Sequence, residues 1–208
     1  MLWQHFPNPD MTLYQNAATR MAQSYNVMPL VPVLESGGLI LYPTDTIWGI
    51  GCDATDAAAV DKVFELKQRP KNKPFVLLAA DTEMLKNYVE HLHPRLETLL
   101  QYHKRPLTLI YDRAKNLPPN CIGADGTVAI RIPQDEFCRD LIAAFGKPLV
   151  ASSANISNEP FPAFFGEISS QVISGVDAVA DHRRWDKSPH EPSVIARLDE
   201  RDELVFLR

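Results

Sequence analysis

The stretch Leu39-Ile-Leu-Tyr-Pro-Thr-Asp-Thr-Ile-Trp-Gly-Ile-Gly-Cys-Asp53 decides the fold. Its first four residues are all apolar, which is typical of a short strand that is buried on both faces. Hydroxyl groups, an acid and two glycines follow at once, and ligand-binding loops at strand ends commonly have this composition. We therefore predict a buried strand over 39–42 and a ligand loop over 43–53.

A helix should follow this loop, because Asp56 can cap it and Val60, Val63 and Phe64 form one apolar face. The helix leads into Leu66-Lys-Gln-Arg-Pro-Lys-Asn-Lys-Pro-Phe75, a basic arm with no acid. Its two prolines restrict the backbone, so we expect an ordered loop. A charge run is most often a solvated connector. This basic arm, however, follows a strand–loop–helix unit and belongs to a chain with a formal net charge of -5, and both facts favour a polyanionic ligand.

The rest of the chain mixes strand and helix patterns, which predicts one α/β domain around a twisted mixed sheet flanked by helices. Further strands are expected at 75–79, 107–111, 127–132, 149–151, 176–180, 193–198 and 203–207. Further helices are expected at 11–25, 31–35, 82–88, 94–102, 137–145 and 164–173. We assign residues 1–208 to this single domain, with 1–10 as a loose N-terminal arm and 181–192 as a loop.

Composition narrows the class of protein. The 208 residues are 45% hydrophobic and 23% charged, which is ordinary for one soluble globular domain. A pI near 5.7 argues against a dedicated nucleic-acid binder, although it permits a local basic patch. Three scattered cysteines indicate neither a disulfide framework nor a zinc site, and we predict no protein-held metal. Without a signal peptide or a bilayer-length apolar run, we expect a cytoplasmic protein with no membrane partner.

Small hydrogen-bonding side chains recur at the ends of three predicted strands, at 43–46, at Thr127 with Arg131, and at 152–155. No Walker loop, dinucleotide-binding glycine turn or nucleophile elbow accompanies them. This inventory suits catalysis by positioning and charge neutralisation, as in phosphoryl or nucleotidyl transfer. Each residue also has a plain structural interpretation. Thr44 could cap a turn, and Arg131 could face outward, or inward against an acid.

Taken in order, these segments resemble the YrdC-like family of threonylcarbamoyl-AMP synthases. The matching segments are 43–54, Lys67-Gln-Arg-Pro70 with Lys73-Pro74, 127–133, Ser153-Ala-Asn-Ile-Ser157, Pro192-Ser-Val-Ile195 and Leu207-Arg208. The resemblance spans roughly Leu30 to Arg208 and fits the short form of the family, without an extra C-terminal domain. It implies a YrdC-like open fold with a concave basic groove.

The resemblance also implies a reaction. L-Threonine, bicarbonate and ATP would give threonylcarbamoyl-adenylate and pyrophosphate, with Mg²⁺ on the phosphates. The product would serve N6-threonylcarbamoyladenosine formation at position 37 of tRNA, so other tRNA threonylcarbamoylation proteins are expected partners. Two alternatives stay open. One is a non-catalytic paralogue that binds double-stranded RNA or tRNA, and the other is a carbamoyl-transfer enzyme.

Ten residues receive roles from this resemblance. Lys67 and Arg69 would be catalytic and face ligand rather than core. The nucleotide would be bound by Arg69, Lys73, Thr127, Asn155 and Arg208, and the other substrates by Thr46, Arg131, Ser153 and Ser193. Four positions depart from the family pattern: Leu78 replaces a histidine, Lys73 an asparagine, Asn158 a glycine and Val194 a threonine. Most of these departures bear on the threonine half of the site.

Overall fold

Short apolar runs form most of the strands, as the sequence predicts. The computed structural model describes residues 25–188 and 190–207, so the 1–10 arm and nearly all of the helix predicted at 11–25 lie outside it. The strands are β1 (Ile40–Tyr42), β2 (Gly49–Gly51), β3 (Val76–Leu78), β4 (Leu107–Tyr111), β5 (Val128–Arg131), β6 (Leu149–Ser153), β7 (Ala178–Val179), β8 (Val194–Leu198) and β9 (Leu204–Phe206).

Helix α3 begins at the predicted cap, Asp56. Asp56 accepts a hydrogen bond from the backbone N–H of Ala58 and starts α3, and Gly146 ends α6 in the left-handed conformation. The α-helices are α2 (Val31–Glu35), α3 (Ala57–Lys67), α4 (Thr82–Lys86), α5 (Pro94–Tyr102), α6 (Glu136–Phe145) and α7 (Ser170–Ser174). Three 3₁₀ turns complete the described part: η1 (Met28–Leu30), η2 (Pro119–Cys121) and η3 (Phe165–Glu167).

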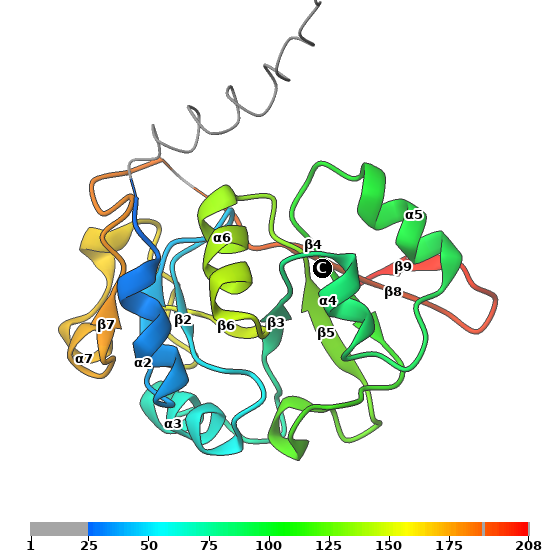
Figure 1. Cartoon of the computed structure of the whole chain (residues 1–208), viewed down its shortest axis with the longest axis horizontal. Coiled ribbons are helices and arrows are strands. Elements are labelled where there is room, and N and C mark those ends of the chain that lie inside the picture. The colour runs from blue at the N-terminus through cyan, green and yellow to red at the C-terminus, as the bar shows by residue number, and fades with distance from the viewer. Residues whose placement is uncertain (1–24, 189, 208) are drawn as a thin grey trace, which may run out of the picture.

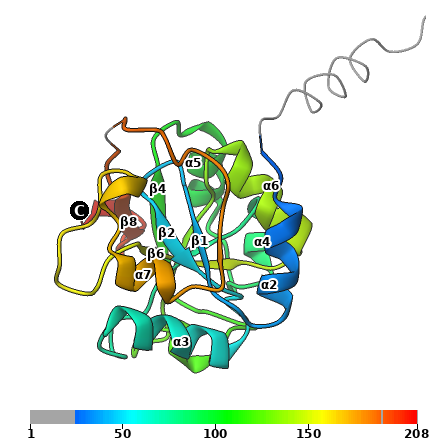
Figure 2. The ribbon, with the colours of Figure 1, turned by 90° about the vertical axis from the view of Figure 1, so that its left-hand side faces the viewer.

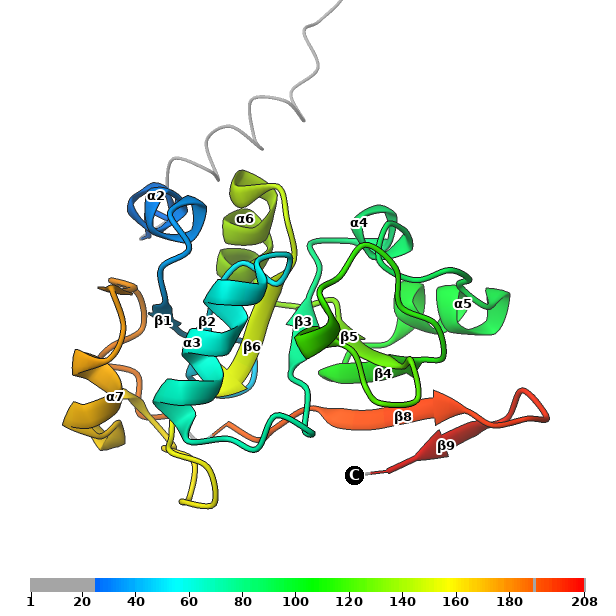
Figure 3. The same ribbon diagram turned by 90° about the horizontal axis from the view of Figure 1, so that it is seen from below.

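These elements build a single α/β domain. Within the described ranges the strands form one nine-stranded mixed sheet in the order β7-β1-β2-β6-β3-β5-β4-β8-β9. The pairs β1–β7, β3–β5 and β4–β8 are parallel, and the others are antiparallel. Figure 1 shows α2 and α6 side by side, and Figure 3 shows the β8–β9 hairpin on the opposite side of the molecule from α2, α6 and α4. No helix in the described ranges is long and apolar enough to cross a membrane.

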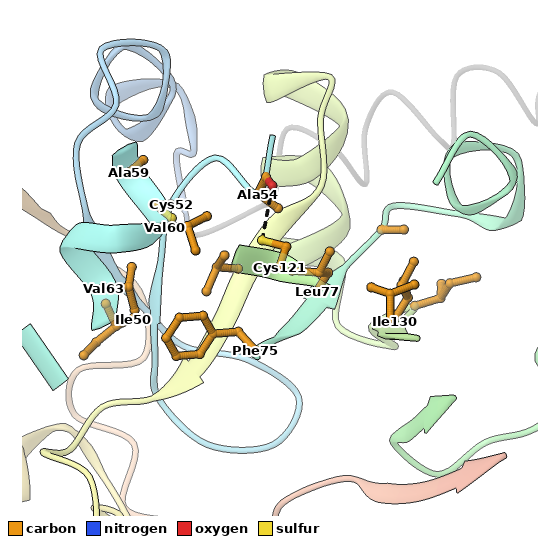
Figure 4. Packing of buried hydrophobic residues seen from close by; sticks show 14 of the residues in the cluster. Ile50, Cys52, Ala54, Ala59, Val60, Val63, Phe75, Leu77, Cys121 and Ile130 are labelled. Carbon is orange, nitrogen blue, oxygen red and sulfur yellow. Dashed lines mark hydrogen bonds between the residues drawn. The ribbon is translucent and has the colours of Figure 1, made fainter. Parts of the chain in front are cut away.

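Strand alternation divides the apolar residues between two clusters. The larger cluster contains the middle residues of the central strands, such as Ile50 and Leu77, packed against Val60 and Val63 of α3 (Figure 4). The second cluster joins Tyr42 and other residues of β1 to α2 and α6. In Figure 2, α2 and α6 lie to the right of β1 and β2, whereas α3 lies below them. Helices therefore cover part of each face of the sheet.

Two local predictions were wrong. The predicted ligand loop at 43–53 contains strand β2, which pairs with β1 and β6. A Cβ at Gly51 would lie 2.6 Å from the Tyr42 ring and 2.8 Å from the Val150 oxygen, so close packing requires glycine there. The helix predicted at 164–173 is split into η3 and α7, because Ser169 caps a new helix at that point.

Candidate active site

A row of small and medium side chains across four strands lines one face of a large cavity. Ile110, Ala129, Val76 and Ala151 are successive cross-strand partners on β4, β5, β3 and β6, and all four line this cavity. The next row, with Leu109, Ile130, Leu77 and Val150, belongs to the hydrophobic core instead. The two alanines leave open space above the sheet, and the resulting cavity has a volume of about 450 Å³.

The Thr44–Thr46 turn and the end of β5 form one wall of this cavity. The two threonine hydroxyls lie 2.8 Å apart, and the Arg131 NH2 donates to Thr46 Oγ1 at 3.3 Å. Arg131 also pairs with Asp45, and only 4% of the Arg131 side chain and 10% of the Asp45 side chain are exposed. The structure therefore decides between the two interpretations of Arg131: it faces inward against an acid. Its Nε is buried without a hydrogen-bond partner among the described residues.

Hydroxyl groups line the far side of the cavity. Ser193 Oγ lies 2.7 Å from Thr108 Oγ1, and both residues are buried. Thr127 donates from its hydroxyl to Asp125 Oδ1 at 2.7 Å and also lines the cavity. Both of these predicted site residues, Ser193 and Thr127, thus reach the same cavity as Arg131.

A second cavity of about 190 Å³ holds the cationic end of the site. Its lining includes Lys67, Lys73 and Asn155, and it shares Arg69 and Ser153 with the large cavity. The basic arm and the loop after β6 therefore lie next to each other, and the two cavities meet at Arg69 and Ser153, which line both. An anion in the smaller cavity would lie beside an amino-acid-sized ligand in the larger one.

Arg69 is half-buried and is held by the basic arm itself. Its Nε donates to the carbonyl oxygen of Lys73 at 2.7 Å and its NH2 donates to that of Pro74 at 3.2 Å. The guanidinium carbon lies 5.1 Å from the centroid of the Phe75 ring. Burial lowers the pKa of Arg69 from its ordinary value. These contacts fix the guanidinium at the junction of the two cavities. Because the partners are two carbonyl oxygens and an aromatic ring, none of them neutralises the positive charge of Arg69.

Lys67 differs from the prediction that it faces ligand rather than core. It is only 1% exposed, and its Nζ donates to the carbonyl oxygens of Ser153 and Asn155, the latter at 2.6 Å. Burial lowers its pKa to about 7, and the charge of Arg69 acts in the same direction. Lys67 therefore ties the end of α3 to the loop after β6. Its acceptors in these contacts are carbonyl oxygens rather than a carboxylate, and Lys67 still lines the smaller cavity.

Nine of the ten predicted site residues line one cavity or the other, and Arg208 lies outside the described residues. The departures from the family pattern are spread more widely. Leu78 is fully buried in the second hydrophobic cluster, and Asn158 has a φ of 71° beside the smaller cavity. Val194 begins β8, next to Ser193.

No site role was predicted for three residues at or near the large cavity. Two of them are aromatic, and the third comes from a distant part of the chain. Trp48 was interpreted as packing, and it does pack on Phe165 with centroids 4.9 Å apart, but it also lines the large cavity. Phe161 lines the same cavity and is 45% exposed. Arg183, from the loop predicted at 181–192, reaches the Thr44 turn. Trp48 and Arg183 act through contacts with segments remote in sequence, which a local pattern does not record.

Comparison with known proteins gives a consistent set of relatives. The family model Sua5_yciO_yrdC, described as "Telomere recombination", matches residues 32–208. A protein of Stenotrophomonas maltophilia named threonylcarbamoyl-AMP synthase is 34% identical over 159 residues, covering 73% of this chain and 83% of the relative. A Vibrio cholerae protein of the same name is 32% identical over 178 residues, covering 84% of this chain and 94% of the relative.

The relative from Pyrococcus abyssi is longer than this chain. The threonylcarbamoyl-AMP synthase of Pyrococcus abyssi is 29% identical over 172 residues, and the match covers 82% of this chain but only 50% of the relative. The crystal structure of P. abyssi Sua5 complexed with L-threonine superposes with a TM-score of 0.78 at 28% identity, covering 88% of this chain and 53% of that chain. This chain thus spans about half the length of these Pyrococcus proteins and most of the length of the bacterial ones.

Proposed function

The chain belongs to the Sua5/YciO/YrdC family, and we propose that it is a threonylcarbamoyl-AMP synthase. Its substrates would be L-threonine, bicarbonate and ATP, the last as its magnesium complex. The observation that carries this proposal is the meeting of two cavities at Arg69 and Ser153, one of them lined by lysines and the other by Arg131 and hydroxyls. A triphosphate suits the first lining, and an amino acid suits the second.

The reaction requires three anionic groups to be held together: the threonine carboxylate, the carbamate and the triphosphate. The threonine amine and bicarbonate form a carbamate with loss of water. A carbamate oxygen then attacks the α-phosphorus of ATP, the bond from that phosphorus to the bridging oxygen breaks, and pyrophosphate leaves. Coulomb repulsion between the carbamate and the phosphates opposes this approach, so cations at the junction lower the barrier by neutralising charge and by fixing geometry.

Each predicted residue has a proposed task. Lys67, Arg69 and Lys73 attract the triphosphate, and Arg69 is placed to act where the two ligands meet. Arg131 and Thr46 bind the amino acid, with the unpartnered Arg131 Nε as a donor for its carboxylate. The remaining residues complete the pocket: Ser153 and Asn155 at the junction, Thr127 and Arg208 toward the nucleotide, and Ser193 toward the amino acid.

Magnesium is proposed to enter with ATP. The linings of the two cavities contain hydroxyls, amides and cations but no carboxylate, and the described residues hold no cluster of three possible metal-ligating side chains. Mg²⁺ keeps water and phosphate ligands readily, so the nucleotide can supply its coordination. We further propose that the adenylate passes to cytoplasmic partners that modify tRNA.

Pyrophosphate release tests the proposal directly. The protein is incubated with MgATP, bicarbonate and L-threonine, and parallel reactions omit one substrate each or replace threonine by valine. We expect release only in the complete reaction, together with threonylcarbamoyl-adenylate detected by mass spectrometry. Release that does not depend on threonine, or no release at all, would refute the assignment.

A further inference from the structure

The connection between β7 and β8 packs against the Thr44–Thr46 turn. A cavity of only about 10 Å³ separates them, with Thr44 and Thr46 on one side and Arg183, Asp186, Ser188 and His190 on the other. Residues 181–192 of this connection were predicted as a loop. The contacts of the connection make it an additional layer behind one wall of the large cavity.

Arg183 is the residue of this connection that hydrogen-bonds to the Thr44–Thr46 turn. Its NH1 donates to Asp135 Oδ2 at 2.6 Å, and its NH2 donates to the carbonyl oxygen of Thr44. The Arg183 side chain is 24% exposed and that of Asp135 is 12% exposed. Asp135 also caps α6 through the backbone N–H of Cys138. One guanidinium therefore joins the turn after β1 to the start of α6.

Asp45 links the same turn both to Arg131 at the end of β5 and to the chain just before α6. Asp45 Oδ2 accepts from the backbone N–H of Gln134 at 2.9 Å, and Gln134 is the chain neighbour of Asp135. The hydrogen bonds close a ring that runs through Arg183, Thr44, Thr46, Arg131, Asp45, Gln134 and Asp135. Three members of the ring, Thr44, Thr46 and Arg131, line the large cavity. Arg183 itself does not line that cavity.

The backbone at Arg183 accepts an unfavourable conformation to make these contacts. Its φ is 54°, in the left-handed region that costs a residue with a Cβ about 1 kcal/mol. Such conformations persist where surrounding contacts over-determine them, and they cluster at functional sites.

We propose that Arg183 is a positioning residue for the amino-acid end of the cavity. By holding the Thr44 carbonyl and the Asp135 carboxylate together, it fixes the direction of the Thr46 hydroxyl and of the Arg131 guanidinium. The proposal rests on the proposed function, since it takes threonine as the ligand of those two groups. Arg183 does not line the cavity of about 450 Å³ and touches no reacting atom.

The test compares variants at Arg183 with a matched variant of its neighbour. Arg184 lies in the same connection and donates to the carbonyl oxygens of Ala180 and Val179, but it takes no part in the ring. For R183M we expect the KM for threonine to rise about tenfold, while kcat and the KM for ATP stay within about twofold. R183K should recover part of the loss, because one amine can replace one of the two donors. R184M should leave the KM for threonine unchanged.

R183G removes the side chain and also relieves the left-handed backbone, so it keeps the test decisive if R183M folds poorly. Calorimetric titration with threonine runs beside the kinetic assay. An unchanged threonine affinity in R183M and R183G overturns the proposal, and so does an equal loss of ATP and threonine affinity. If the wild type binds threonine without releasing pyrophosphate, the proposed function fails. The ratio of threonine affinities between the wild type and R183M then still tests the role of Arg183. If the wild type binds no threonine, both fail.

Discussion

Replacing Asp45 by asparagine is expected to destabilise the protein strongly. The substitution keeps the shape of the side chain, and its oxygen can still accept from the backbone N–H of Gln134. It removes the negative charge that pairs with Arg131. Because only 4% of the Arg131 side chain is exposed, water cannot readily take the place of the lost partner.

The size of the effect follows from this burial. Breaking a buried ion pair by removing one partner costs about 3–5 kcal/mol, since the remaining charge is left uncompensated. For a chain of 208 residues, each kcal/mol lowers the Tm by about 2–4 °C, so the expected decrease is about 6–20 °C. The double variant D45N/R131M removes both charges and should recover part of this loss.

Urea denaturation and calorimetry of the wild type, D45N and D45N/R131M measure these free energies of unfolding. D181N is the matched control, because its carboxylate is 96% exposed and lies 3.7 Å from Arg184. It should change the stability by less than about 0.5 kcal/mol. Added threonine should raise the Tm of D45N more than that of the wild type, since its carboxylate can replace the missing charge. A D45N variant as stable as D181N would refute this reasoning.

Three further predictions concern other parts of the site. The pKa of Lys67 is lowered from 10.5 to about 7, so between these values the unfolded chain binds more protons. Stability should therefore rise with pH across that window, by up to about 1 kcal/mol per pH unit, and urea denaturation of K67M should show a flatter profile. R69M should weaken ATP binding in calorimetric titration by about tenfold or more. K71M is the control and should not weaken it, because Lys71 is exposed and lines neither cavity. Equal losses of ATP affinity in the two variants would contradict the role of Arg69. G51A should cost about 1–3 kcal/mol, since its Cβ would lie 2.8 Å from a carbonyl oxygen of β6, whereas G49A has its nearest neighbour at 3.4 Å and should cost less in the same denaturation assay.

Local patterns in the sequence were sufficient for most elements of the fold. The bounds of α5 and β4 match their predictions, because apolar periodicity and capping residues are local signals. Strand β2 was missed for the opposite reason. Gly49 and Gly51 are poor strand formers, and they occur there because the neighbouring Tyr42 ring and β6 backbone leave no room for a Cβ at Gly51. The order of the strands in the sheet also depends on distant contacts that no local pattern records.

The sequence predicted several residues that line the two cavities, but not the contacts between them. Motif resemblance brought Thr46, Arg131 and Ser153 together, and all three line the large cavity. The partner of Arg131 was left open, because Asp45 lies 86 residues away in the chain. The same holds for Lys67, whose carbonyl acceptors lie on the loop after β6. Composition alone cannot distinguish a lysine that faces ligand from one that holds a loop in place.

The two ends of the site satisfy their cations with different acceptors, and this difference explains how an acidic chain can attract a polyanion. Arg69 donates to neutral carbonyl oxygens, so its positive charge stays available at the smaller cavity. Arg131 donates to a carboxylate, so the amino-acid end is close to neutral. A triphosphate is therefore favoured at the first end, and a zwitterion is tolerated at the second. A formal net charge of -5 does not weaken the first effect much, because charges more than about 10 Å away are screened at moderate salt.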